Sequence, residues 1–420
     1  MGIEVVVEGL SKSFGHHVVW RDISLSLPAG EVSVMLGPSG TGKTVFLKSL
    51  VGLIKPDRGR VLVDGIDTVS CSERHLYRAR KMFGVMFQDG ALFGSMNLYD
   101  NVAFPLREHT KLTEGNIRHK VLEKMDMVGL AGDGHKFPGE ISGGMRKRAG
   151  LARALVMDPQ IILCDEPDSG LDPVRTAYLS QLLIDLNAQI DATLLIVTHD
   201  IQIARTVPDN IGMLYRGNLV MFGPREVLLT SENPVVTQFV NGRRIGPIGM
   251  SEEKDAATLA AEQANGTSGE GDNGLPALVP QLVPSSGMPE REAVARRTAR
   301  VMSLLHTLPF PAQRAILESL NPTHPGSTAP PARPVPAHAP MAPVSETAPL
   351  PRRPGTPQSR QAQAPDWAQP TAPVYGGPAE EGPQAGWWGR LSRRDPGRHA
   401  AEDPQDPAYP DPEQPGGGRR

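Results

Sequence analysis

The sequence is poor in the features that mark secreted, membrane-spanning and nucleic-acid-binding proteins. It has two cysteines in 420 residues, too few for a disulfide framework, and Cys164, which follows three aliphatic residues, is expected to lie in the core. Nowhere do about 18 apolar residues follow one another, as a membrane span requires, and the first residues lack the pattern of a signal peptide. The net charge of −3 gives no reason to expect nucleic acid as a partner. These absences predict a soluble, intracellular protein.

Proline is unevenly distributed, and this sets the predicted domain count. More than half of the 41 prolines lie beyond Leu320, in a segment with too little apolar surface to offset the entropy of ordering it. We therefore expect residues 321–420 to form a disordered Pro-rich tail. The foldable part is predicted to be one α/β domain over residues 1–248, followed by a linker over 249–286 and a short helical extension over 287–320.

Two short helices are predicted within the extension. Pro289 and the acidic residues after it resemble the start of a helix, and residues 312–320 have the pattern of a second amphipathic helix. The first helix carries four apolar residues on one face, namely Val294, Val301, Leu305 and Leu308. We expect this face to dock on another surface; the alternative is a transient helix in a disordered tail.

The order of the remaining elements predicts an α/β fold with an inserted helical subdomain. A buried strand over residues 31–36 leads into a Gly-rich turn and then a helix over 44–50, which is the start of a βαβ-type unit. Helical patterns replace strand signals after Leu92, so we expect a helical subdomain over about residues 90–155. Further strands are predicted over residues 5–7, 60–63, 83–87, 161–164 and 193–198.

A phosphate-binding loop is the most specific motif in the sequence. Residues 37–44 match G-x-x-x-x-G-K-S/T between a predicted strand and a predicted helix, which is the context that the motif requires. Its glycines let successive backbone N–H groups surround a polyphosphate at the positive end of the helix. Lys43 is expected to reach the β- and γ-phosphates, and Thr44 to bind Mg²⁺. The predicted ATP-binding residues are Gly37, Pro38, Ser39, Gly40, Thr41, Gly42, Lys43 and Thr44.

Two further groups of residues suit the same chemistry. The strand over 161–164 ends in Asp165, which suits Mg²⁺ binding, and in Glu166, which suits the general base that activates water. Ser142–Gly144 precede a helical stretch over 147–156, and a hydroxyl with bare N–H groups at a helix start is a second phosphate-binding arrangement. In isolation, the first pair is also typical of an exposed loop and the second group of an ordinary helix cap.

These elements in this order resemble the ATP-binding cassette of ABC transporters over about the first 245 residues. The positions that match the family's motifs are Phe14 for the aromatic that stacks on adenine, Gln88 for the Q-loop glutamine, Ser142, Gly143 and Gly144 for the signature, Asp172 for the D-loop and His199 for the switch histidine. The resemblance implies a homodimer of cassettes, with each ATP between the phosphate loop of one subunit and the signature of the other.

The resemblance also implies roles for individual side chains. Gln88, Glu166 and His199 are expected to be the catalytic residues, and Thr44, Gln88 and Asp165 to hold Mg²⁺. Without the family context, Gln88 would be interpreted as a surface amide and His199 as a structural histidine.

Three positions depart from the family's commonest pattern. Phe14 stands where tyrosine is usual, but stacking needs only the face of the ring. Met145 follows the second signature glycine, where glutamine is common. Asp168 occupies a position that more often holds a small or hydroxylic residue.

Longer stretches resemble the Mla/Mce lipid-transport branch of the family, and in particular the actinobacterial Mce-associated ATPases. They cover residues 88–93, 100–110, 141–153, 165–178, 241–254 and 288–320. This resemblance implies a peripheral ATPase on the cytoplasmic face of the cell membrane that drives lipid or steroid import with YrbE-type permeases and Mce substrate-binding proteins. The alternatives are the ATPase of an exporter or of an importer with another substrate. A non-transport ABC protein is disfavoured by the single phosphate loop and the lack of a heptad insertion.

Overall fold

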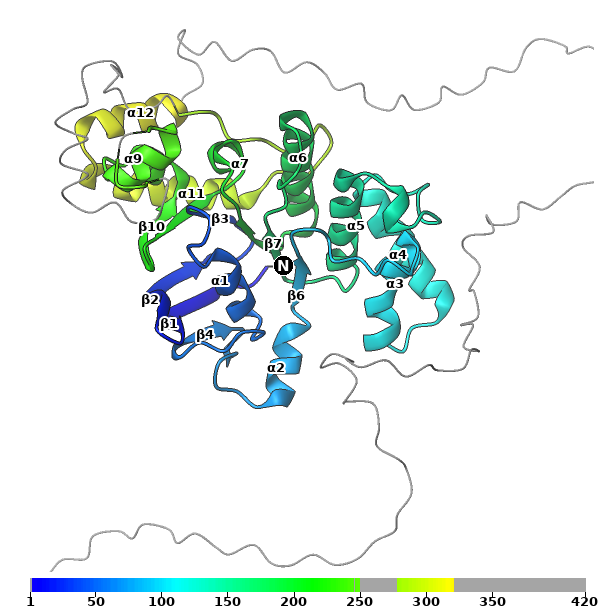
Figure 1. Cartoon of the computed structure of the whole chain (residues 1–420). Coiled ribbons are helices and arrows are strands. Elements are labelled where there is room, and N and C mark those ends of the chain that lie inside the picture. Colours follow the sequence, from blue (N-terminus) through cyan, green and yellow to red (C-terminus); the bar gives the residue numbers. More distant parts are fainter. Residues whose placement is uncertain (1, 245, 250–277, 321–420) are drawn as a thin grey trace, which may run out of the picture. The chain divides into compact units, whose positions relative to one another are not determined.

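The computed structural model describes residues 2–244, 246–249 and 278–320 (Figure 1). All of them belong to the first of two units of the chain, residues 1–370. The predicted Pro-rich tail and most of the predicted linker lie outside the described residues. In the described part of the chain, none of the helices has the length and hydrophobicity of a membrane span.

The central sheet has six strands in the order β10-β9-β3-β8-β7-β6. Every residue of β3, β7 and β8 is buried, as expected for parallel strands that are covered on both faces. Five strands are parallel and β10 is antiparallel to β9. Their bounds are β3 (Val32–Leu36), β6 (Phe83–Met86), β7 (Ile161–Asp165), β8 (Thr193–Val197), β9 (Asn210–Tyr215) and β10 (Asn218–Pro224). The predicted strands over 31–36, 83–87, 161–164 and 193–198 are thus confirmed.

A second sheet is antiparallel and packs on one face of the first through a shared helix. It consists of β2 (His17–Leu27), β1 (Val5–Phe14), β4 (Arg58–Val63) and β5 (Ile66–Asp67), in that order. Helix α1 (Lys43–Leu50) contributes Phe46 and Leu47 to a core that also contains Trp20 of β2 and Leu195 of β8. The second sheet therefore closes over the helix that follows the phosphate loop.

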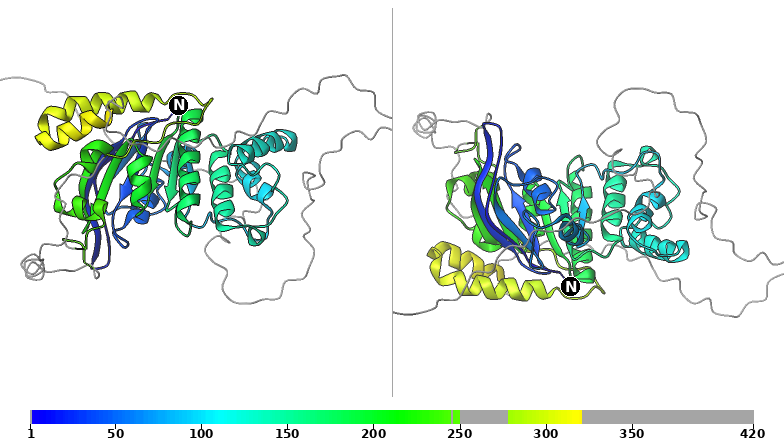
Figure 2. Two further views of the ribbon diagram at one scale, coloured as in Figure 1. Left: turned by 90° about the horizontal axis from the view of Figure 1, so that it is seen from above. Right: turned by 90° about the horizontal axis from the view of Figure 1, so that it is seen from below.

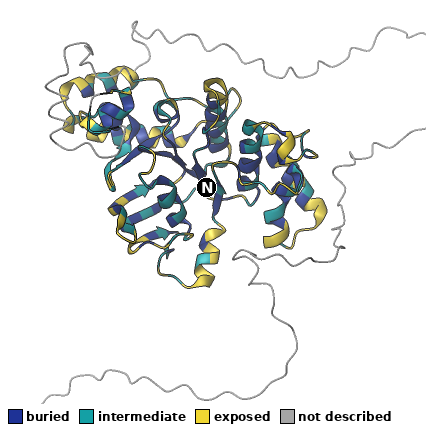
Figure 3. Ribbon diagram, viewed as in Figure 1, coloured by how far each residue is buried: buried dark blue, intermediate teal, exposed yellow. Residues whose placement is uncertain are grey.

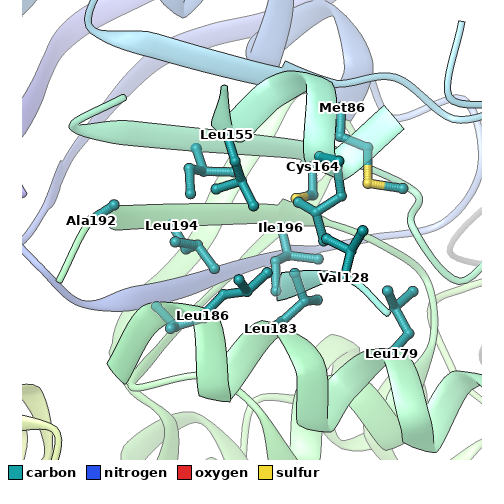
Figure 4. Packing of buried hydrophobic residues seen from close by; sticks show 14 of the residues in the cluster. Met86, Val128, Leu155, Cys164, Leu179, Leu183, Leu186, Ala192, Leu194 and Ile196 are labelled. Atoms are coloured by element: carbon teal, nitrogen blue, oxygen red, sulfur yellow. The ribbon is translucent and has the colours of Figure 1, made fainter. Parts of the chain in front are cut away.

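The helices on the other face of the central sheet complete the core (Figures 3 and 4). Leu179, Leu183 and Leu186 of α6 (Pro173–Ile190) face Cys164 of β7 and Ile196 of β8, and Figure 3 shows the buried residues gathered in these central strands. Cys164 is fully buried, as the sequence predicts. The shorter helices around this core are α2 (Glu73–Arg80), α7 (Ile201–Thr206), α8 (Arg225–Leu229) and α9 (Pro234–Asn241).

The interval between β6 and β7 is helical, in the region where the sequence predicts a helical subdomain. It contains α3 (Leu98–His109), α4 (Glu114–Met127), the 3₁₀ turn η1 (Pro138–Glu140) and α5 (Gly143–Leu155). Asn97, Thr113 and Ser142 begin the three α-helices by accepting backbone N–H groups with their side chains. Helix α5 starts four residues before the predicted stretch, so both signature glycines lie in its first turn.

The C-terminal extension packs on the cassette in a way that differs from the prediction (Figures 1 and 2). Helices α11 (Glu292–Leu304) and α12 (Phe310–Leu320) are present, separated by the turn η2 (Leu305–Thr307), but α11 begins at Glu292, beyond the predicted start. Of the four apolar residues on the predicted docking face, only Val301 is buried. The predicted apolar face is therefore buried only in part, with Val294, Leu305 and Leu308 half-buried.

Arginines provide the polar anchors of α11. Arg291, whose side chain is 1% exposed, pairs with Asp209, and Arg300 pairs with Glu31; both acids are buried, each immediately before a strand of the central sheet. Arg297 lies 3.5 Å from Asp209. The segment before α11 also docks, because the Gln281 side chain donates 3.0 Å hydrogen bonds to the Val207 and Pro208 carbonyls. Residues 278–286 of the predicted linker thus form part of the packed structure.

Candidate functional site

The phosphate loop joins β3 to α1, and its glycines are required by its surroundings. Gly40 and Gly42 have φ of 84°, which favours glycine. A Cβ atom on Gly42 would lie 2.2 Å from Val19 Cγ1, and one on Gly37 would lie 2.4 Å from the Leu214 carbonyl oxygen. Helix α1 begins at Lys43 without a side-chain cap, so its first backbone N–H groups suit an anion at this end of the helix.

Lys43 lies inside this loop. Its Nζ donates to the carbonyl oxygens of Gly37 and Pro38 at 2.8 and 2.9 Å. Burial lowers the pKa of Lys43, and the nearby carboxylates of Glu166 and Asp165 offset part of that effect. The loop therefore holds a cation among backbone dipoles, beside two acids at the end of β7.

Thr44 and Asp165 place two oxygens together. The Thr44 hydroxyl donates to Asp165 Oδ1 at 2.8 Å. Burial raises the pKa of Asp165, and the hydrogen bond from Thr44 opposes the rise. A hydroxyl and a carboxylate are ligands that suit Mg²⁺. Gln88 is exposed two residues beyond β6; since Met86 pairs with Cys164, the register brings Gln88 to the same edge of the sheet.

Glu166 and His199 meet where β7 and β8 end. The Glu166 backbone N–H donates to the Val197 carbonyl at 2.8 Å, and Glu166 has a φ of 45°, an unusual value for a glutamate. His199 Nδ1 lies 3.5 Å from Glu166 Oε1. Adjacent parallel strands therefore bring two of the three predicted catalytic groups together, close to Asp165.

Asp168, which departs from the family's pattern, has a partner in the same region. It is buried, and its Oδ1 accepts a 2.7 Å hydrogen bond from the Thr198 hydroxyl, next to His199. Burial raises the pKa of Asp168, and this hydrogen bond opposes the rise. The carboxylate thus ties the loop after Glu166 to the strand end that carries His199.

The signature residues form a second group. Ser142 Oγ accepts the Met145 N–H at 3.3 Å, and Asp172 in the same way caps α6 by accepting the Arg175 N–H at 3.0 Å. Gly144 is close to the D-loop, since a Cβ atom there would lie 3.6 Å from Leu171 Cδ2. A cleft of about 630 Å³ opens beside them, lined by Ser142, Gly144, Met145, Leu171, Arg175 and others.

Phe14 ends β1 with half of its surface exposed, and Lys12 Nζ lies 5.1 Å from the centre of its ring. A base stacked on this ring would lie near the Lys12 ammonium group. The ring belongs to the same antiparallel sheet that packs over the helix after the phosphate loop.

Asn101 is a residue whose role the sequence does not reveal. It is fully buried in α3; its Oδ1 accepts the Phe93 N–H at 2.7 Å, and its Nδ2 donates to the carbonyls of Phe93, Met96 and Asn97. Phe93 is 43% exposed and packs on Phe104, with the ring centres 4.9 Å apart. An exposed aromatic side chain therefore stands on a loop that the Asn101 side chain holds from within.

Known proteins resemble this chain over most of its described length. The ABC transporter family profile matches residues 20–169. The "probable ribonucleotide transport ATP-binding protein mkl" of Mycobacterium tuberculosis is 69% identical over 327 residues, which cover 77% of this chain and 91% of that protein. The "intermembrane phospholipid transport system ATP-binding protein MlaF" of Escherichia coli is 38% identical over 58% of this chain and 91% of its own length.

Solved structures agree with the observed architecture. The cassette CbiO1 of Clostridium perfringens, part of the ABC transporter complex CbiONQ, superimposes with a TM-score of 0.51 at 29% identity, covering 57% of this chain and 94% of that one. The dimeric structure of a bacterial ABC transporter cassette gives a TM-score of 0.50 at 29% identity, covering 53% and 98%.

Proposed function

This chain belongs to the ABC transporter family and is the ATP-binding, ATP-hydrolysing subunit of such a transporter. We propose that it energises the import of lipids or steroids. The observation that carries the proposal is the resemblance to the phospholipid-transport ATPase MlaF over 91% of that protein, together with the complete set of nucleotide-directed residues. We propose that its partners are YrbE-type permeases and Mce substrate-binding proteins, at the cytoplasmic face of the cell membrane.

We assign Glu166 as the general base. Its carboxylate acts on the charge of Lys43 in the phosphate loop and lies 3.5 Å from His199 Nδ1. We propose that His199 orients the glutamate and contacts the terminal phosphate. Gln88, at the same edge of the sheet, would sense that phosphate. Thr44, Asp165 and Gln88 would hold Mg²⁺, which neutralises charge on the phosphate oxygens when bound.

Two copies of the chain would form the working ATPase. The phosphate loop leads into α1, which packs between the two sheets, whereas the signature leads into α5 in the helical region. Each offers backbone N–H groups at a helix start. A head-to-tail pair would bring the phosphate loop of one copy to the signature of the other, so that both arrangements serve the same ATP.

The loop around Phe93 is the surface that we propose for the permease. It follows Gln88 closely in the chain, so a conformational change that begins at the bound phosphate would be transmitted to it over few residues. The fixed loop and its exposed ring suit a socket for an amphipathic segment of a membrane protein. Leu92 packs against the core and is not part of that surface.

The Phe93 surface is tested by Phe93→Asp. The variant should no longer co-purify with the permease from membranes, while the isolated chain keeps its Kd for ATP. Leu112→Asp is a matched control, because Leu112 is similarly exposed, at 37%, in the loop between α3 and α4. Retained co-purification of Phe93→Asp, or equal loss in both variants, would refute the assignment.

The cargo is tested by uptake in cells that lack the gene for this chain. Labelled sterol or long-chain lipid uptake should fall, and uptake of sugars and amino acids should not. The name of the mycobacterial relative makes ribonucleotide transport the second candidate, so a labelled ribonucleoside belongs in the same assay. Loss of ribonucleoside uptake with normal lipid uptake would overturn the lipid proposal and leave the ATPase intact.

A further inference from the structure

Lys147 is a buried cation on the signature helix. It lies in α5, five residues after Ser142, and only 4% of its surface is exposed. Its Nζ donates to the Glu166 carbonyl at 3.2 Å, to the Ser169 carbonyl, and to the Ser169 hydroxyl at 3.1 Å. These three acceptors match the three N–H donors of an ammonium group.

All three acceptors belong to the loop that follows β7. The loop begins with Glu166 in a left-handed backbone conformation, which is unfavourable for a residue other than glycine and persists only when the surroundings enforce it. On one side the loop is held by β8, through the Glu166 N–H on the Val197 carbonyl and the Thr198 hydroxyl on Asp168. On the other side it is held by Lys147.

The cation is retained at a cost. Burial lowers the pKa of Lys147, and the carboxylates of Asp168, Asp89 and Glu166 offset part of the effect. An apolar residue would avoid this cost at a buried helix position. The neighbouring Arg148 also binds two carbonyls, those of Val128 and Gly129 at 3.0 Å, but these belong to the helical region. Lys147 alone of the two reaches the catalytic loop.

We propose that Lys147 is a positioning residue, through which the signature helix α5 holds the loop that carries Glu166. Phosphate bound at the Ser142 end of α5 would then set the position of Glu166 in the same subunit. The ATP held by one cassette would thereby influence hydrolysis of the ATP held by the other. This inference rests on the proposed two-cassette arrangement and on Glu166 as the base.

The test compares Lys147→Met with Arg148→Met in the full-length chain. We expect Lys147→Met to lower kcat by about 10- to 100-fold, because a small displacement of a reacting group has effects of that size. Its Kd and KM for ATP should stay within about twofold of wild type, the pattern for an interaction used after binding. Its Hill coefficient for ATP should fall toward one. Lys147→Arg should recover part of the loss, and Arg148→Met should keep the wild-type kcat and Hill coefficient.

Several outcomes would overturn the proposal. One is an unchanged kcat in Lys147→Met. Another is a loss of kcat in step with Kd and melting temperature, to the same degree as in Arg148→Met, which would show a merely structural role. A lower kcat with a wild-type Hill coefficient would overturn the coupling between sites. The base assignment fails separately, through normal turnover in a Glu166 variant with Lys147 intact.

Discussion

A substitution of Arg291 is the most direct test of whether the C-terminal extension stabilises the cassette. Its guanidinium pairs with Asp209 and donates to the Asn187 side chain, and both charged side chains are almost inaccessible to water. Arg291→Ala removes the cation and leaves the carboxylate buried. Breaking a buried pair from one side costs about 3–5 kcal/mol, because the remaining charge is not compensated.

Asp209 keeps other partners, so the lower end of that range applies. Its carboxylate still accepts the Val32 N–H at 2.9 Å and the Gln281 side chain at 3.1 Å, and Arg297 remains 3.5 Å away. A loss of about 3 kcal/mol in a domain of this size corresponds to a fall of about 6–12 °C in melting temperature. Scanning calorimetry of the full-length chain without nucleotide measures it.

Arg296→Ala is the matched control. Arg296 is on the same helix but 42% exposed, with Glu292 at 3.4 Å and Glu31 at 3.6 Å, and an exposed pair contributes at most about 1 kcal/mol. Equal melting temperatures for the two variants would refute the reasoning. A second check is the double variant Arg291→Met, Asp209→Asn, which should regain part of the loss because it removes both charges of the pair, while Arg297 keeps Glu226 at 3.5 Å.

Other predictions follow from the same structure. Ending the chain after Leu320 should leave the melting temperature unchanged, whereas ending it after Met250 should lower it by more than Arg291→Ala does; equal effects in calorimetry would mean that the extension is dispensable. Glu166→Gln should bind ATP but lose about 10²–10⁴-fold in turnover and form an ATP-dependent dimer on a sizing column; near-normal turnover would move the base elsewhere. Lys43→Ala should fail earlier, at ATP binding in calorimetric titration. Burial raises the pKa of the Cys164 thiol to about 12, so a Cys71→Ser variant should show no thiol that alkylates at neutral pH without denaturant; rapid labelling would contradict the buried core.

The sequence was sufficient for the nucleotide end of the fold because local rules govern it. A fully buried strand such as β3 is a continuous apolar run, and the glycine loop and helix after it follow from backbone sterics. The site residues at the ends of β7 and β8 could be grouped because strands of a parallel sheet end at one edge. Strand β9 could not be predicted: Gly212 interrupts its pattern, and only the packed structure shows that a Cβ atom there would lie 2.8 Å from Phe222 Cδ2.

The contacts made by cations were beyond local reasoning. The predicted interface of the extension was apolar because amphipathic periodicity is the signal that a single helix carries. The partners of its arginines, Asp209 and Glu31, lie 82 and 269 residues away in the chain. The role of Lys147 could not be predicted for the same reason, since its acceptors, two backbone carbonyls and one hydroxyl, lie in a loop 19 to 22 residues downstream.

The identity of the cargo is the part of the function that the residues of the cassette indicate least. Phe14, the phosphate loop, Glu166 and the signature residues all suit a nucleotide, and the same chemistry would serve a phospholipid system or a ribonucleotide system equally well. The two names carried by the relatives therefore do not disagree about this site. Selection of cargo has to enter through the choice of permease, and on this chain that choice is proposed to rest with the loop around Phe93. A swap of that loop between this chain and an ATPase of a different importer should transfer permease binding without transferring ATP affinity.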